Sequence, residues 1–168
     1  MIILGIDPGT ATTGYAIIKK QKSSGKGNGA DNADFQILDF GVISTAKTLS
    51  DAKRLVILQT DLQKILKKFK PDLAGVEKLY FENNAKTAMN VSQARGVVIF
   101  TLEKNKLPLR EFTPLQVKST ICGYGNADKK QVQFMVQKSF ALKNLPKPDD
   151  AADALAIALC AAWSWKNN

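Results

Sequence analysis

The spacing of apolar residues along the chain predicts its first three elements. Residues 1–6 are apolar at nearly every position, which is typical of a strand covered on both faces of a sheet. After the turn at Pro8-Gly9, apolar residues resume over 14–18, so the opening is predicted to be a β-hairpin. Residues 35–44 again have strand-like composition. We therefore expect three successive strands in an antiparallel meander.

The pattern then changes from a strand period to a helical one. Ser50 is a suitable N-cap, and apolar residues at helical spacing predict an amphipathic helix that ends before Pro71. Residues 73–76 form a short apolar run and predict a fourth strand. A strand, helix and strand in succession require a crossover, so this strand is expected parallel to the first and beside it.

Further elements follow to the end of the chain. Asn83 or Asn84 can cap a helix that runs to about Asn105. Its small residues can face either the sheet or a second subunit; they are Ala85, Ala88, Ser92 and Gly96. Residues 107–112 predict a fifth strand at a sheet edge, because Pro108 cannot donate to a ladder. The remaining prediction is a short helix over 114–121, a glycine-containing loop over 123–130, a helix after it, and a last helix that begins after Pro148.

Composition changes this picture in two respects. With 168 residues and 45% hydrophobic content, the chain is expected to form one domain over 1–168, with a flexible loop at about 21–34 that is rich in Gly, Ser, Asn and Lys. A net charge of +9 favours a polyanionic partner such as nucleic acid, although it also fits a membrane surface or simple solubility. The longest uncharged apolar run, 154–163, is too short to span a bilayer, and no secretory segment is apparent. A cytoplasmic protein is expected.

The absence of histidine excludes several mechanisms. No Ser-His-Asp triad, Cys-His pair or histidine-based zinc site can be assembled. Cys122 and Cys160 lack the CxxC spacing of a redox pair or zinc knuckle, and we interpret both as core or near-core residues. Hydrolytic chemistry in this chain must therefore use carboxylates, lysines, hydroxyls or a metal.

Four acidic residues are candidates for such chemistry. Asp7 and Glu77 each end a predicted buried strand, where an ionised carboxylate needs a partner. For Asp7 alone, a simple turn before Pro-Gly explains the residue equally well. Asp150 and Asp153 are three residues apart, on one face of the last helix. Asp149 or Asp150 is also a good helix N-cap, which accounts for one of these aspartates but not for Asp153.

Together the four acids predict a site for hard divalent cations. Oxygen-only ligands suit Mg²⁺ or Mn²⁺, and such ions activate water and stabilise the leaving oxygen of a phosphodiester. Lys118, Lys129 and Lys130 flank the predicted 123–130 loop, where lysines can hold phosphate, although a lysine-rich loop is more often only solvated.

Four segments that contain the candidate residues follow one another along the chain: LGIDPGTATTGYA, GVEKLYFENNAKTAMNVSQARGV, QVKSTICGYGNADKKQV and PDDAADALAIAL. With these four motifs in the family's order, the chain resembles the RuvC family of Holliday-junction resolvases (crossover junction endodeoxyribonucleases), within the ribonuclease H-like superfamily. The resemblance covers nearly the whole chain. It implies an α/β fold whose five-stranded mixed sheet, three antiparallel strands then two parallel, is flanked by helices. It also implies a homodimer that nicks four-way DNA junctions symmetrically during recombination and repair, and a branch-migration motor as partner.

The resemblance assigns roles residue by residue. It implies that Asp7, Glu77, Asp150 and Asp153 are catalytic and hold Mg²⁺, two ions per site with Mn²⁺ as a substitute. It gives phosphate-binding roles to Lys118 and Lys129, and none to Lys130. Where the family often has a phenylalanine three residues after the catalytic glutamate, this chain has Tyr80 followed by Phe81, and either ring can stack on a base near the exchange point.

Three other functions remain open from the sequence. An RNA-processing nuclease of the same superfamily would share the Asp7 hairpin, and it differs in the DAAD-bearing last helix. An actin-like or sugar-kinase ATPase uses a similar hairpin but needs two such domains. A non-catalytic DNA-binding module would bind junctions without metal-dependent cleavage.

Overall fold

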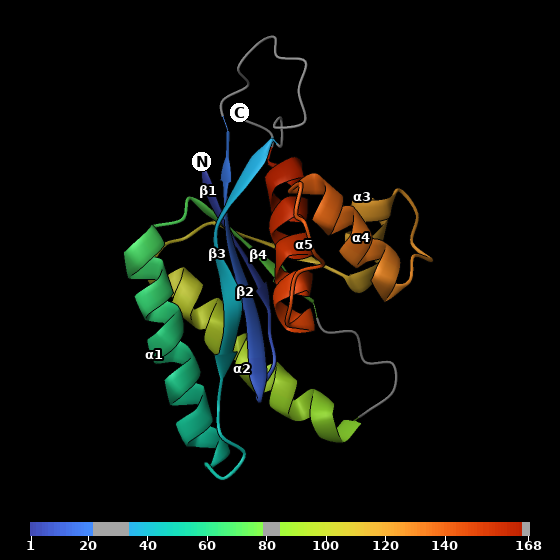
Figure 1. The fold of residues 1–168 in the computed structure, drawn as a ribbon. Helices are drawn as coiled ribbons and strands as arrows, with labels where there is room; N and C mark the ends of the chain where they lie inside the picture. The colour runs from blue at the N-terminus through green and yellow to red at the C-terminus, as the bar shows by residue number, and fades with distance from the viewer. Residues whose placement is uncertain (22–33, 79–84, 166–168) are drawn as a thin grey trace, which may run out of the picture.

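The computed structural model of the chain describes residues 1–21, 34–78 and 85–165. In this part of the chain five strands form a single mixed sheet, with helices on both of its faces (Figure 1). The elements in chain order are β1 Ile2–Asp7, β2 Thr12–Lys20, β3 Phe35–Ser44, α1 Asp51–Phe69, β4 Leu73–Glu77, α2 Ala85–Lys104, β5 Leu109–Phe112, α3 Pro114–Cys122, α4 Lys129–Ser139 and α5 Asp149–Ser164.

The sheet has the strand order β3-β2-β1-β4-β5. β1 pairs antiparallel with β2, and β2 with β3, whereas β1 with β4 and β4 with β5 are parallel. The predicted meander and the parallel crossover strand are therefore confirmed. β1 lies in the middle of the sheet, as its continuous apolar run predicts, and β5 forms an edge.

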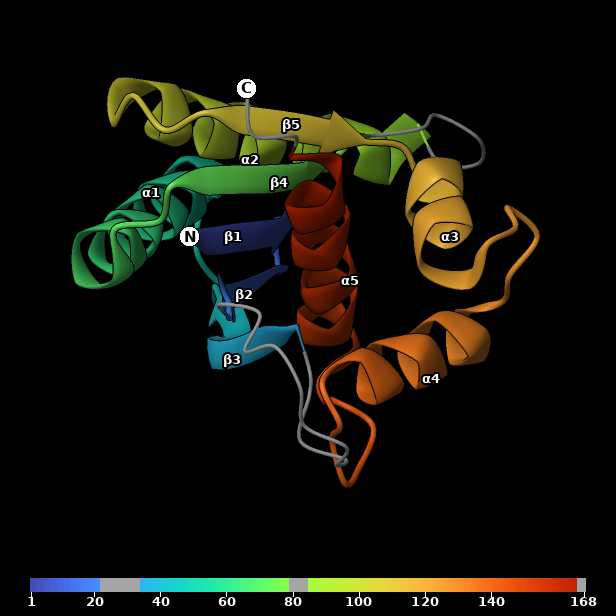
Figure 2. The ribbon, with the colours of Figure 1, turned by 90° about the horizontal axis from the view of Figure 1, so that it is seen from above.

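Helices lie on both faces of the sheet (Figure 2), and a hydrophobic cluster is buried under each set. On one face, α5 packs against β1, β2 and β4, with α3 and α4 beside it. On the other face, leucines of α1 and apolar residues of α2 pack on the alternate strand positions, including Leu4, Ile6 and Val76. Cys160 is buried and Cys122 half-buried, which confirms the interpretation of both as core or near-core residues.

Local signals at the helix ends explain most of the predicted boundaries. The Ser50 hydroxyl accepts a hydrogen bond from the Lys53 amide and caps α1, as predicted. β5 begins only after Pro108, whose carbonyl accepts a hydrogen bond from the Ala74 amide. No helix in the described ranges is long and apolar enough to cross a membrane.

Three predictions about boundaries need correction or lie outside the described residues. The glycine-containing loop ends at Asp128, because Asp128 and Gln131 form a capping box and α4 begins at Lys129. Neither Asp149 nor Asp150 caps α5, because the N-cap is Pro148, which provides no side-chain hydrogen bond. Most of the predicted 21–34 loop and the predicted caps of α2, Asn83 and Asn84, lie outside the described residues.

Candidate active site

Strand register brings the two strand-end acids side by side. β1 and β4 are paired with Gly5 opposite Gly75 and Ile6 opposite Val76, so Asp7 and Glu77 follow as the next residues of the two strands. Side chains alternate along a strand, and Ile6 and Val76 point into the α1/α2 layer. Asp7 and Glu77 must then point to the opposite face, toward α5. Both predicted acids therefore end neighbouring strands on the same face.

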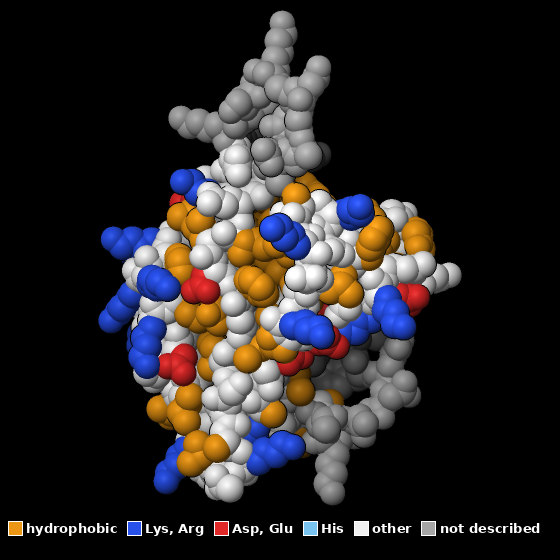
Figure 3. Space-filling model, in the orientation of Figure 1, with side chains coloured by type: hydrophobic (Ala, Val, Ile, Leu, Met, Phe, Trp, Pro, Cys, Tyr) orange, Lys and Arg blue, Asp and Glu red, His pale blue; other side chains and the backbone are white. Residues whose placement is uncertain are grey.

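Close packing of α5 places the other two acids at the same end of the sheet. A methyl group at Gly14 would collide with the Asp150 carbonyl oxygen, and one at Gly5 with that of Ala154. The helix backbone can lie directly on the strands only because these two positions carry no side chain. Since Gly14 pairs with Asp7, the first turn of α5 lies over the end of β1. Figure 3 shows acidic side chains at this end of α5, with Lys and Arg side chains beside them.

The acids perturb one another's ionisation. Burial, together with the negative charges of Glu77, Asp153 and Asp150, raises the pKa of Asp7 from 3.8 to about 8. Burial and the charge of Asp153 raise the pKa of Glu77 from 4.5 to about 7. The pKa of Asp153 is also raised, chiefly by burial. These groups therefore form one electrostatically coupled cluster, and a cation between them would offset both the burial and the repulsion that raise their pKa values.

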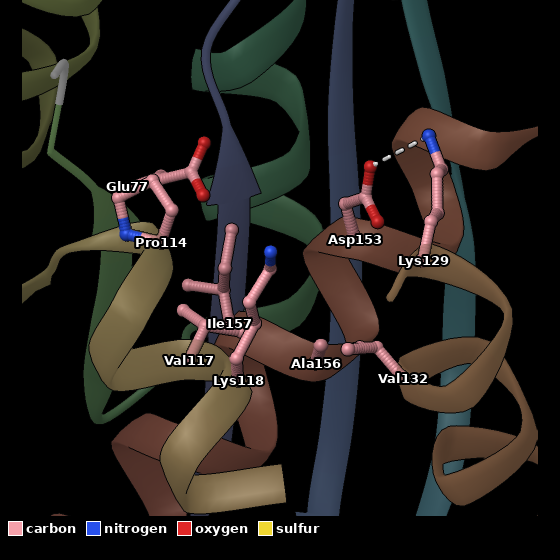
Figure 4. Close-up of a pocket in the computed structure, with 9 residues that line it drawn as sticks. All are labelled: Glu77, Pro114, Val117, Lys118, Lys129, Val132, Asp153, Ala156 and Ile157. Atoms are coloured by element: carbon pink, nitrogen blue, oxygen red, sulfur yellow. Dashed lines mark ion pairs between the residues drawn. The ribbon is translucent and has the colours of Figure 1, made fainter. Parts of the chain in front are cut away.

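The two predicted lysines reach the same site from α3 and α4. A pocket of 210 Å³ is lined by Glu77, Asp153, Lys118 and Lys129, with apolar walls from α3, α4 and α5. Figure 4 shows Lys118 extending toward the space between Glu77 and Asp153. Prediction from sequence placed Lys129 in a loop, whereas the first turn of α4 holds it. Lys130, which has no assigned role, is exposed and does not line the pocket.

Lys129 makes two ion pairs with acids of α5. Its Nζ atom lies 3.3 Å from Oδ2 of Asp153 and 3.2 Å from Oδ2 of Asp149. Burial alone would lower the pKa of Lys129, but these two carboxylates raise it above its ordinary value. Asp149, which we considered only as a helix cap, also accepts a hydrogen bond from Gln133. The sequence shows no periodic signal for this pairing, because it depends on the angle between α4 and α5.

The donor set suits a hard cation, but its side chains are not gathered around one point. In residues 1–21, 34–78 and 85–165, no three acidic or cysteine side chains lie close enough together to hold a metal ion. Asp153 is turned toward Lys129 (Figure 4). The carboxylate chemistry fits Mg²⁺ or Mn²⁺, so the assignment of Asp7, Glu77, Asp150 and Asp153 as metal ligands stays a prediction. Tyr80 and Phe81, the predicted stacking residues, lie outside the described residues.

Comparisons with known proteins identify the family. The family model described as crossover junction endodeoxyribonuclease RuvC matches residues 3–161. The crossover junction endodeoxyribonuclease RuvC of Caldicellulosiruptor saccharolyticus is 46% identical over 160 residues, which are 95% of this chain and 91% of that protein. That of Halothermothrix orenii is also 46% identical, over all of this chain and 96% of its own length.

A solved structure of Thermus thermophilus RuvC aligns with a TM-score of 0.85 and 29% identity, covering 97% of this chain and 94% of that one. A second structure shows the Thermus protein in complex with a Holliday junction substrate. The yeast mitochondrial resolvase Ydc2, at 16% identity and a TM-score of 0.64, shares the fold. The chain therefore belongs to the RuvC family of crossover junction endodeoxyribonucleases, which are nucleases that depend on a divalent metal.

Proposed function

We propose that this protein binds four-way DNA junctions as a homodimer and nicks two strands symmetrically, with Mg²⁺ held by Asp7, Glu77, Asp150 and Asp153. The observation that carries the proposal is the convergence of two strand-end acids with the first turn of α5 beside a pocket that contains two lysines. Phosphodiester hydrolysis needs both halves of this arrangement. The acids provide ligands for a cation, and the lysines provide charge for the phosphate.

The roles of the acids follow from their positions. Bound Mg²⁺ would polarise the scissile phosphate and lower the pKa of an attacking water, and two ions would serve both sides of the displacement. Asp7 and Glu77 are fixed by the main chain of adjacent strands, whereas Asp153 projects from α5 and pairs with Lys129. To join a shared site, Asp153 must exchange this ion pair for the cation. Lys129 would then keep its ion pair with Asp149 and could also donate to a phosphate oxygen.

Lys118 and Lys129 are suited to hold that phosphate. Both line the pocket, and Lys118 extends from α3 toward its centre (Figure 4). Charge that develops on the phosphate oxygens during displacement would be balanced by the two ammonium groups. The phosphate-binding roles that the family resemblance gives these lysines are therefore compatible with their geometry.

The outer face of α2 supports the proposal of a dimer. Gly96 is exposed, and apart from its chain neighbours and the adjacent backbone of α2 no atom of the described residues lies within 4 Å of the position that a methyl group would occupy there. Met89 and Phe100 of the same helix are 68% and 60% exposed. The buried apolar residues of α2 in the core on this face of the sheet are Ala94, Val98 and Leu102, so Gly96 points away from the sheet. A substrate with two-fold symmetry is matched by a C2 dimer. The branch-migration motor rests on the family resemblance alone.

One assay tests the proposed activity. A labelled four-way junction is incubated with the protein in Mg²⁺ or in EDTA, beside a linear duplex and an RNA junction of the same sequence. We expect paired nicks at symmetric positions in the DNA junction with Mg²⁺ only. Binding without nicking would favour a DNA-binding module, and cleavage of the RNA junction would favour an RNA-processing nuclease.

A further inference from the structure

Arg95 of α2 contacts the main chain of Glu77 from the back of the sheet. Its Nε atom donates a hydrogen bond of 3.2 Å to the Glu77 carbonyl oxygen. Its guanidinium also forms an ion pair with Oε1 of Glu111 on β5. The two side chains are 23% and 29% exposed, and that oxygen of Glu111 is buried. One arginine therefore joins α2, the end of β4 and β5.

Strand register explains why these groups meet. Glu111 pairs with Val76, whose side chain points into the α1/α2 layer, so Glu111 lies on the α2 side of the sheet. The Glu77 side chain points the other way, toward α5. The next amide, that of Lys78, bonds to the Phe112 carbonyl at 2.8 Å. The end of β4 is thus held by β5 at its edge and by Arg95 from behind.

We propose that Arg95 is a positioning residue for cleavage: it fixes the main chain of Glu77 so that the carboxylate is presented beside Asp7. This inference rests on the proposed catalytic role of Glu77. Arginine suits the task because its planar fork presents N–H donors in fixed directions to two acceptors, whereas a lysine ammonium is a point charge on a flexible stem. Small displacements matter here, because catalytic groups must be held to within about 0.5 Å of their productive positions.

The same contact links the site to the proposed dimer. Gly96, which follows Arg95 directly, lies on the exposed face of α2. A partner subunit that docks on this face would restrain the helix that holds the main chain of Glu77. In such a dimer, association and cleavage would be coupled through Arg95.

A purely structural role for Arg95 makes a different prediction. Removal of one member of a half-buried ion pair destabilises a fold because it leaves a charge without its partner. In that case the Arg95→Met protein would unfold at a lower temperature, but its folded fraction would cleave junctions at the normal rate. Stability and rate must therefore be measured separately.

The experiment compares Arg95→Met, Arg95→Lys, Glu111→Gln and Glu77→Gln with the wild-type protein. Arg110→Met is the matched control, because Arg110 lies on the same strand as Glu111, is exposed, and stacks near Trp165. Each variant is assayed for single-turnover cleavage of a four-way junction at saturating enzyme and Mg²⁺. Junction affinity in EDTA, the thermal midpoint and hydrogen exchange at the Lys78 amide are measured in parallel.

We expect Arg95→Met to cleave at least about 10-fold more slowly, as for residues that orient metal ligands, with junction affinity unchanged and faster exchange at Lys78. Arg95→Lys should regain the thermal midpoint but not the cleavage rate.

A wild-type cleavage rate in Arg95→Lys would overturn the inference. A wild-type rate in Arg95→Met would also overturn it, provided that Glu77→Gln is inactive. Active Glu77→Gln would instead refute the proposed site. If Arg95→Met does not fold, the cleavage rates of Arg95→Lys and Glu111→Gln decide between a positioning role and a purely structural one.

Discussion

The two faces of the sheet are packed in different ways. On the α1/α2 face, branched side chains such as Leu58, Leu62 and Leu66 fill the space between helices and strands. On the α5 face, a helix rich in buried alanine lies with its backbone against Gly5 and Gly14. Both arrangements bury apolar volume, but only the second brings a helix backbone directly onto the strands and so fixes the distance between them. We infer that the leucine packing of the α1/α2 face supplies stability, whereas the α5 face supplies stability and also sets the geometry of the site.

The acids at the edge of the α5 face should give the largest effect on activity. Asp7→Asn keeps the shape of the side chain but removes a ligand charge, so Mg²⁺-dependent nicking should fall at least about 1,000-fold, the upper end of losses for one group that stabilises a transition state. The thermal midpoint in EDTA should not fall, because burial and neighbouring acids already oppose the charge on Asp7.

Asp61→Asn is the matched control for this variant. Asp61 lies on α1 and forms a surface ion pair with Lys64, so nicking should not change. Near-normal nicking by Asp7→Asn would end the proposal that the four acids hold the catalytic metal.

The lysines of the α5 face should have the next largest effect. Alanine at Lys118 or Lys129 should lower the cleavage rate about 100-fold, because a donor to the developing phosphate charge is lost. Each change should also reduce the slope of log affinity against log salt by about 1 if the lysine contacts a phosphate. Cleavage assays and gel shifts at several salt concentrations measure both effects.

Lys67→Ala on α1 controls for the loss of a positive charge. Lys67 is exposed in the last turn of that helix, and its removal should leave cleavage unchanged. Equal salt slopes and rates in Lys118→Ala, Lys129→Ala and the wild-type protein would show that these lysines are only solvated surface.

A pair of core variants tests the comparison itself. Leu62→Ala removes a buried side chain of the α1/α2 face and should lower the free energy of unfolding by about 2–5 kcal/mol. Gly14→Ala should cost about 1–3 kcal/mol by overpacking. Only Gly14→Ala pushes against the Asp150 carbonyl, so it should lower cleavage about 10-fold, since small misplacements reduce rate strongly.

Denaturant unfolding and cleavage at a temperature where both proteins are folded distinguish these outcomes. If Leu62→Ala loses cleavage as much as Gly14→Ala does, the two faces do not divide stability and geometry in this way.

The sequence predicted features that depend on a local pattern and missed those that depend on packing between elements. Strands, the Ser50 cap and the strand-end positions of Asp7 and Glu77 follow from residue spacing, and the structure confirms them. The start of α4 was wrong because the Asp128 capping box was not recognised. The glycines and alanines were visible, but nothing local shows that Gly14 would meet Asp150.

Arg95 and Asp149 illustrate the same limit at the site. Arg95 stands in a family motif, yet its contacts with Glu77 and Glu111 require the register between β4 and β5. Asp149 was considered as a helix cap, and its pairing with Lys129 requires the placement of α4 beside α5. Residues that act through other residues are therefore the least visible from a single sequence.

The last prediction concerns stability rather than cleavage: a pH dependence that belongs to the α5 face alone. In the folded protein the pKa of Asp7 is about 8 and that of Glu77 about 7, against 3.8 and 4.5 as ordinary values. Between about pH 4 and pH 8 the folded state therefore keeps protons that the unfolded chain has released. By linkage, the free energy of unfolding without metal should fall as pH rises through this range.

Denaturant unfolding in EDTA at intervals from pH 4 to pH 8 measures this slope. Asp7→Asn should flatten it, whereas Asp61→Asn on the other face should leave it unchanged, because only the former removes a titrating group from the cluster. Added Mg²⁺ should stabilise the wild-type protein more at pH 8 than at pH 5, since a cation binds carboxylates that have lost their protons. An equal slope in Asp7→Asn and the wild-type protein would show that the acids of the α5 face do not repel one another enough to oppose folding. The site would then need no cation to relieve such repulsion.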